Sequence, residues 1–214
     1  ATFKAIPKYT LTIYRSGSGT VTSNPAGINC GSDCSEPYLN GTVVTLSATP
    51  ASGYTFGGWS GACTGTANCT VTMSAARSVI ATFKAIPKYT LTIYRSGSGT
   101  VTSNPVGINC GSDCSEPYLS GTTVALTATA ATGYYFSGWS GACTGTANCT
   151  VTMSAARSVT ATFKANPVLT VSRSGSGTVT SNPVGINCGS DCSEPYLSGT
   201  TVALTATAAT GYYF

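Results

Sequence analysis

The sequence predicts an all-β or β-rich chain, arranged as a tandem array of small domains of about 80 residues with local disulfides. Three observations support this fold class. The segment Ala1–Thr10 returns unchanged as Ala81–Thr90, which establishes an internal repeat. Short runs rich in Thr, Val, Tyr and Ile alternate with Gly, Asn and Pro, without the 3.6-residue period of a helix. Cysteines recur in closely spaced pairs at the same places in each unit.

The repeat divides the chain into four parts. Residues 1–8 are expected to be the end of a preceding unit and its linker, residues 9–88 the first repeat, and residues 89–166 the second. Residues 167–214 form a third, truncated repeat. We therefore expect the sequence to be a window cut from a longer protein.

The first repeat is expected to contain six strands, each a short run of β-branched and aromatic residues bounded by turn residues. In order they are Tyr9–Arg15, Thr20–Ser23, Thr42–Thr49, Tyr54–Trp59, Thr70–Met73 and Ser78–Ala85. Tight turns are expected at Ser16–Gly19 and Asn40–Gly41. At most one helical turn is expected, at Ser74–Arg77.

Differences between the first two copies identify the buried face of the strands. In the central strand Val43, Thr45 and Ser47 are replaced in the second copy, whereas the intervening residues recur. Substitutions at every second residue indicate a sheet with one buried face and one free face. The predicted core of the first unit is Leu11, Ile13, Val21, Val44, Leu46, Ala48, Tyr54, Phe56, Trp59, Val71, Met73, Val79, Ala81 and Phe83.

The cysteines form C-x3-C and C-x5-C pairs. Four cysteines in a unit allow three pairings, and we favour the local ones because each pair encloses a loop rich in small and polar residues. Zinc coordination by four thiolates is the alternative, but it prefers C-x2-C spacing. The cysteines are Cys30, Cys34, Cys63, Cys69, Cys110, Cys114, Cys143, Cys149, Cys188 and Cys192.

All the acidic residues lie in one recurring segment, GINCGSDCSEP. They are Asp33, Glu36, Asp113, Glu116, Asp191 and Glu194. Three interpretations are open: a calcium ligand set, which two carboxylates per loop support only thinly; a solvated turn that aids solubility; or a docking surface for bases on other segments. The bases of the first unit are Arg15, Arg77, Lys84 and Lys88.

The aromatic residues are a further candidate site. Tyr54, Phe56 and Trp59 could form a platform for stacking against a sugar, but their positions in the alternation favour core packing. Tyr135 replaces Thr55 of the first copy on the outward face. It is therefore the one aromatic side chain expected to contact a ligand.

Composition excludes several classes of function. A net charge of +4 with only 7% charged residues is too dilute for a nucleic-acid surface, and no apolar run approaches the length of a membrane span. The chain has no histidine, and its carboxylates share one loop, so no pair of nucleophile and base is evident and we expect no enzyme activity. Regular cysteine pairs point to an oxidising, extracellular compartment. No cofactor is expected, apart from the calcium considered above.

The segments GYTFGGWSGAC, from Gly53, and TVTMSAARSVIATF, from Thr70, resemble the divergent InlB B-type repeats of bacterial surface proteins. The resemblance covers each whole unit. It implies small β-rich domains, β-grasp-like in fold, strung along secreted or cell-surface proteins as stalks and adhesive modules. The cysteine pairs depart from the simplest form of that repeat.

These observations predict a structural array in a secreted or cell-surface bacterial protein, forming a stalk or an extracellular filament. Near-identical units support this because each junction repeats the same interface. The expected partners are neighbouring repeats or copies of the same chain. The alternative is an adhesin or glycan-binding module that uses outward aromatic positions to bind a glycan or protein on a host or bacterial surface.

Overall fold

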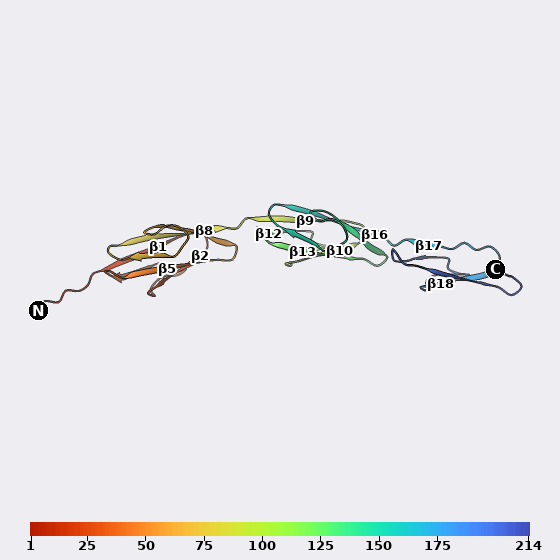
Figure 1. Cartoon of the computed structure of the whole chain (residues 1–214), viewed down its shortest axis with the longest axis horizontal. Helices are drawn as coiled ribbons and strands as arrows, with labels where there is room; N and C mark the ends of the chain where they lie inside the picture. The colour runs from red at the N-terminus through yellow and green to blue at the C-terminus, as the bar shows by residue number, and fades with distance from the viewer. The chain divides into compact units, whose positions relative to one another are not determined.

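The computed structural model describes residues 1–214, in two compact units, Ala1–Pro87 and Lys88–Phe214 (Figure 1). Every regular element is a β-strand, which confirms the predicted fold class. The helical turn considered at residues 74–77 is absent. The chain therefore has no helix that could cross a membrane.

The first repeat contains eight strands. They are β1 (Lys8–Ser16), β2 (Gly19–Asn24), β3 (Asn29–Cys30), β4 (Ser35–Leu39), β5 (Val43–Pro50), β6 (Tyr54–Gly61), β7 (Cys69–Thr72) and β8 (Arg77–Ala85). Each of the six predicted strands overlaps one of these. The two strands missing from the prediction, β3 and β4, lie in the GINCGSDCSEP segment and contain Cys30 and Glu36, whereas Asp33 and Cys34 lie between them.

The second repeat contains the same eight strands, and the third contains five. Those of the second are β9 (Lys88–Ser96), β10 (Gly99–Asn104), β11 (Asn109–Cys110), β12 (Ser115–Leu119), β13 (Thr123–Ala130), β14 (Tyr134–Gly141), β15 (Cys149–Thr152) and β16 (Arg157–Ala165). Those of the third are β17 (Val168–Thr170), β18 (Gly177–Asn182), β19 (Asn187–Cys188), β20 (Ser193–Pro195) and β21 (Ala203–Ala208).

Each complete repeat is built from two four-stranded sheets. In the first repeat the order is β4-β1-β8-β6 in one sheet and β3-β2-β5-β7 in the other. The central pair of the first sheet, β1 and β8, is parallel, with pairs from Leu11↔Arg77 to Ser16↔Thr82. All other neighbouring strands are antiparallel. The second repeat has the same two sheets.

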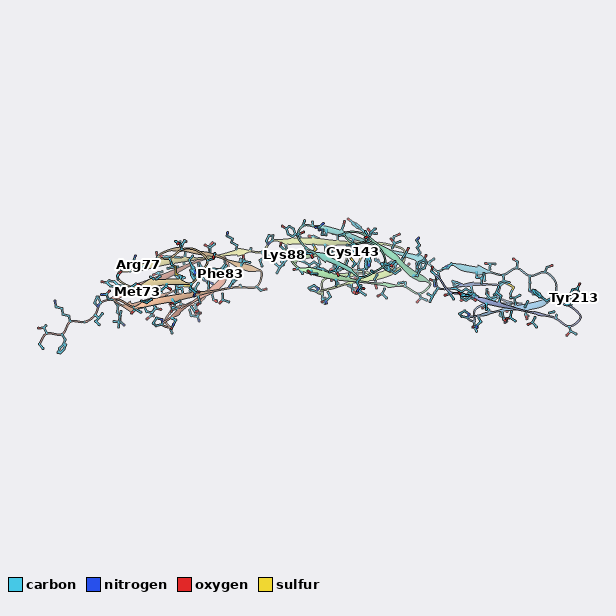
Figure 2. All side chains as sticks on the ribbon, in the orientation of Figure 1. Met73, Arg77, Phe83, Lys88, Cys143 and Tyr213 are labelled. Atoms are coloured by element: carbon cyan, nitrogen blue, oxygen red, sulfur yellow. A yellow bond between two sulfur atoms is a disulfide. The ribbon has the colours of Figure 1, made fainter.

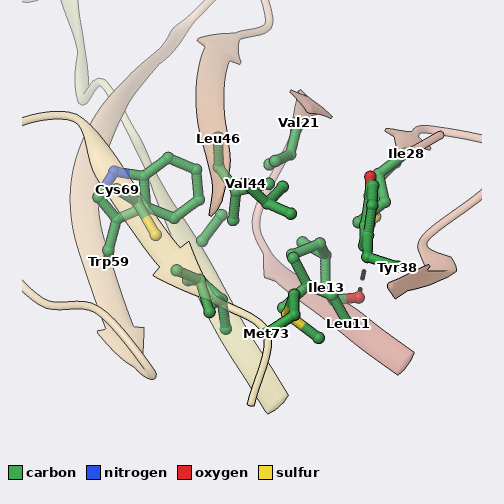
Figure 3. Close-up of a cluster of buried hydrophobic side chains, with 14 of the residues drawn as sticks. Leu11, Ile13, Val21, Ile28, Tyr38, Val44, Leu46, Trp59, Cys69 and Met73 are labelled. Atoms are coloured by element: carbon green, nitrogen blue, oxygen red, sulfur yellow. Dashed lines mark hydrogen bonds between the residues drawn. The ribbon is translucent and has the colours of Figure 1, made fainter. Parts of the chain in front are cut away.

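The core of the first repeat is one cluster of buried side chains (Figure 3). Of the predicted core, Ala48, Tyr54 and Phe56 are only partly buried, and the other predicted members are buried. Trp59 and Cys69 lie at one end of the drawn cluster, with Tyr38 and Ile28 at the other. The buried residues that the prediction missed are Ile28, Cys30, Tyr38 and Cys69.

A β-bulge explains how Trp59 reaches the core. Strict alternation would turn Trp59 away from the face that Phe56 occupies, because the two lie three residues apart. The pairing of β6 with β8 shifts register between Phe56 and Gly58, and Gly58 has φ of 124°. The extra residue restores Trp59 to the inner face, where its ring meets that of Phe56 at a centroid distance of 4.9 Å.

Gly19 allows the ring of Phe83 to close over the start of β2. A Cβ atom at Gly19 would lie 2.4 Å from the Phe83 ring, and one at Gly99 would lie 2.5 Å from Phe163. Both phenylalanines are only 3% exposed, so neither ring has room to retreat. Close packing of the last strand against β2 therefore requires glycine at this position.

We expect the paired change Gly19→Ala and Gly99→Ala to destabilise each repeat by about 1–3 kcal/mol through overpacking. Gly31→Ala with Gly111→Ala is the matched control, because a Cβ there meets a threonine methyl at an ordinary 3.5 Å and 3.4 Å. The control should change stability by less than about 0.5 kcal/mol. Denaturant unfolding of the whole chain measures both, and equal midpoints for the two variants would contradict the packing argument.

Candidate functional site

All ten cysteines are joined in local disulfides, as predicted (Figure 2). The pairs are Cys30–Cys34, Cys63–Cys69, Cys110–Cys114, Cys143–Cys149 and Cys188–Cys192. In the first repeat Cys30 and Cys69 are buried in the core, whereas their partners lie nearer the surface. Each bridge therefore ties a surface loop to one end of the core.

The second disulfide loop is held to β6 by Trp59. The backbone N–H of Trp59 donates to the carbonyl of Gly65 at 2.7 Å, and its indole Nε1–H donates to the carbonyl of Ala67 at 3.0 Å. The bridge Cys63–Cys69 closes the same loop. Three connections therefore fix a segment that contains no regular strand.

The two acidic residues of each repeat have different surroundings. Asp33 lies in the exposed turn between β3 and β4, where its Oδ1 accepts a hydrogen bond from Ser35 N–H at 3.3 Å. Glu36 lies within β4 and pairs with Leu11, so both side chains point to the same face of the sheet. Its Cγ would lie 2.5 Å from a Cβ built on Gly27. Glu36 is therefore partly buried at the sheet edge and does not lie in a solvated turn.

The structure offers no support for the calcium interpretation. The chain contains no group of three or more His, Cys, Asp or Glu side chains that could hold a metal ion. Two of the predicted basic partners make other hydrogen bonds: Arg15 donates to the carbonyl of Gly19, and Arg77 donates to Ser74 Oγ at 3.3 Å. Lys84 and Lys88 are exposed on β8 and β9.

The edges of both sheets carry features that hinder strand addition. Edge strand β4 contains Pro37, which lacks an N–H group, and the inward-pointing carboxylate of Glu36. Edge strand β6 carries the bulge and is bridged by Gly65 of the disulfide loop. The edges of the second sheet, β3 and β7, are very short. These are the devices by which β proteins avoid pairing with other chains through their edges.

Tyr38 lies at the end of the core opposite Trp59, where its hydroxyl group belongs to a cluster of hydrogen bonds (Figure 3). Its hydroxyl lies 2.7 Å from Ser23 Oγ and 3.3 Å from the carbonyl of Pro25, and Ser23 Oγ also accepts from Ile28 N–H at 2.9 Å. The same cluster recurs around Tyr118 and Tyr196. Burial raises the pKa of Tyr38 above its usual value of 10.0, with smaller contributions in the same direction from the Glu36 and Asp33 charges.

The predicted ligand contact, Tyr135, is only partly exposed. It lies on β14 opposite Lys164. The exposed aromatic residues on strand faces are instead Tyr14 and Tyr94, at 57% and 58%. Tyr14 lies beside Ile80 of β8 on the outer face of the first sheet. Sequence reasoning could have found both from the alternation around Leu11 and Ile13.

The strands of the two sheets differ in charge. No strand of the second sheet carries a charged residue in any repeat. Its exposed face instead presents hydroxyl pairs, such as Thr20 opposite Thr49 and Thr22 opposite Ser47. This face is therefore uncharged and lined by hydroxyl groups.

The raised pKa of Tyr38 predicts a loss of stability at alkaline pH. Because the folded pKa exceeds the unfolded value, the contribution is fully present below pH 10.0 and is lost as the pH rises through the raised value. Tyr38→Phe should cost about 1 kcal/mol at neutral pH and make the alkaline decline shallower. Tyr14→Phe, at an exposed position, should leave both unchanged. Unfolding midpoints measured from pH 8 to about 12 test this, and a decline as steep in Tyr38→Phe as in the unmodified chain would refute it.

Removing the edge devices should make the chain associate. We expect Glu36→Thr with Pro37→Thr, repeated at Glu116, Pro117, Glu194 and Pro195, to produce oligomers or aggregates at concentrations where the unmodified chain is dispersed. Asp33→Asn with the equivalent changes is the control, because Asp33 lies outside the strand. Size-exclusion chromatography with light scattering measures the mass. An unchanged mass for the edge variant would show that these residues do not protect the edge.

Several solved structures are distantly similar to this chain. A mutant of the shaft pilin SpaA from Lactobacillus rhamnosus GG has a TM-score of 0.37 at 10% identity, over 77% of this chain and 100% of that one. A minor pilin of Streptococcus agalactiae has a TM-score of 0.32 at 11% identity, over 78% and 100%. The pilus adhesin SpaC of L. rhamnosus GG has a TM-score of 0.37 at 9% identity, over 76% and 32%. Similarities this low carry no functional argument.

The sequence comparisons are more specific about the family. No curated protein matches the chain. The family model described as the divergent InlB B-repeat domain matches residues 9–87, 89–167 and 168–214, nearly the whole sequence, which confirms the resemblance inferred from the repeat motifs. The chain therefore belongs to the divergent InlB B-repeat family of bacterial surface repeat domains.

Proposed function

We propose that the chain is a load-bearing stalk segment of a secreted or cell-surface bacterial protein. The observation that carries the proposal is the parallel pairing of the first and last strands of each complete repeat, β1 with β8 and β9 with β16. A tandem array of one family domain supports the same role, since repetition adds length. Cell-surface location follows from the family and from the disulfides.

The direction of the terminal strands determines how a repeat bears tension. In a parallel pair the start of one strand and the end of the other lie at opposite ends of the pair. A pull on Lys8 and Ala85 therefore slides β1 and β8 past each other along their length. Sliding loads all the pairs from Leu11↔Arg77 to Ser16↔Thr82 together. Peeling from one end would break them one after another, at a lower force.

An extracellular filament is the second form of this proposal. The acidic residues lie in one segment, whereas basic residues lie on other strands such as β1 and β8. This separation supports ion pairs between the side chains of neighbouring chains. The protected edges argue against filaments built by strand exchange. We propose no catalytic role, because the family is a repeat domain and no nucleophile and base pair is present in the sequence.

The proposal predicts that resistance to force depends on direction. In single-molecule pulling of the whole chain, handles at Lys8 and Ala85 shear the β1–β8 pair, whereas handles at Ser16 and Ala85 peel it from one end. All three residues are exposed, so attachment leaves the core intact. We expect a clearly higher rupture force for the first geometry.

Two outcomes would count against the stalk. Equal rupture forces in both directions would remove the mechanical role of the parallel pair. Ordered polymers of the isolated chain that dissolve on Asp33→Asn and Glu36→Gln changes in every repeat would favour the filament, with the acidic segment as its contact. Electron microscopy of the chain at high concentration detects such polymers.

A further inference from the structure

A small hollow opens beside Trp59 in the first repeat, with a volume of about 160 Å³. It lies between the end of the paired part of β5 and the second disulfide loop. Pairing of β5 with β7 ends at Leu46↔Cys69, so the loop residues that follow the sheet edge form the opposite wall. The hollow is thus a product of the loop closure at Cys63–Cys69.

The lining combines an aromatic floor with neutral polar walls. Phe56 and Trp59 meet edge to face at the floor, with ring centroids 4.9 Å apart. Thr66 contributes a hydroxyl group, and Asn68 contributes an amide that both donates and accepts hydrogen bonds. The rest of the wall is formed by Leu46, Ala48 and Ala67. No charged residue lines the hollow.

The site is held in place before any ligand arrives. Trp59 donates two hydrogen bonds to the loop, to Gly65 and Ala67, and the disulfide closes the loop. A wall that is already ordered loses little conformational freedom on binding. The indole N–H is used by the loop, so a ligand would take its hydrogen bonds from the hydroxyl and amide groups.

We propose that this hollow binds one neutral sugar residue of a surface glycan. Sugars present hydroxyl groups around an apolar ring face, which matches polar walls above an aromatic floor. The volume is below the roughly 300–1,000 Å³ of pockets that enclose drug-sized ligands, so the hollow has room for no more than one ring. The uncharged lining, continuous with the uncharged second sheet, selects neutral sugars over acidic ones.

The second repeat provides an internal comparison. Its floor is the same, since Phe136 and Trp139 also lie 4.9 Å apart, and Trp139 N–H donates to Gly145 at 2.7 Å. Thr127 replaces Ser47. This side chain points to the exposed face of β13 and away from the hollow, so the second repeat should bind the same sugar about equally well.

Tryptophan fluorescence tests the proposal directly, because Trp59 and Trp139 are the only tryptophans of the chain. In the Trp139→Phe chain, Trp59 is the only tryptophan, so the fluorescence change comes from the first repeat. The probes are neutral hexoses, neutral N-acetylhexosamines and their short oligosaccharides, with uronic acids as the charged comparison. We expect a saturable change with at least one neutral sugar and none with uronic acids.

Matched variants locate the binding. Asn68→Ala should weaken it by about tenfold, as expected for the loss of one hydrogen bond to the ligand. Ser47→Thr should leave binding unchanged, because this side chain points to the exposed face of β5 and away from the hollow. Asn40→Ala, in an exposed turn outside the hollow, should have no effect.

The proposal is overturned if no neutral sugar gives a saturable change, if uronic acids bind as well, or if Asn68→Ala binds as tightly as the unmodified site. Circular dichroism of each variant establishes that it is folded. The outcome is independent of the stalk, because a repeat can resist shear with an empty hollow and can bind a sugar without bearing load.

Discussion

The parallel pair of β1 and β8 is the constraint on which the rest of each domain depends. The two strands come from opposite ends of the repeat, so the chain between them must leave one end of the pair and return to the opposite end. The chain does this with antiparallel strands that form the second sheet and the two flanks of the first. Phe83, at the end of β8, then fits over Gly19 at the start of β2 and joins the two sheets. Loss of the pair would separate the sheets and open the core at once.

Much of this fold could be predicted because burial leaves an alternating pattern in the sequence. The differences between copies at Val43, Thr45 and Ser47 identified the free face of β5 from two copies of one chain. Strands β3 and β4 could not be predicted in this way. They are short and contain cysteine, acid and proline, which have little intrinsic preference for strands, and they form only because β2 and β1 offer partners.

The candidate sites were less accessible to sequence reasoning because they depend on contacts between distant segments. Local disulfides followed from loop composition, but the role of Glu36 required knowing that β4 is an edge strand. Tyr135 was expected to be exposed, and its partial burial reflects its neighbours on β16. The hollow beside Trp59 arises where β5 approaches the second disulfide loop, and neither segment alone contains a recognisable motif.

The short span of each disulfide has a consequence for export. Partners four or six residues apart leave a translocation channel almost together, so a bridge can close before the identical cysteines of the next repeat emerge. Distant partners would have to find each other among interchangeable copies, and eight cysteines already permit 105 pairings. Local closure thus removes the usual penalty of duplicating a cysteine-rich domain. Gene duplication can lengthen such a protein without multiplying its misfolded disulfide isomers.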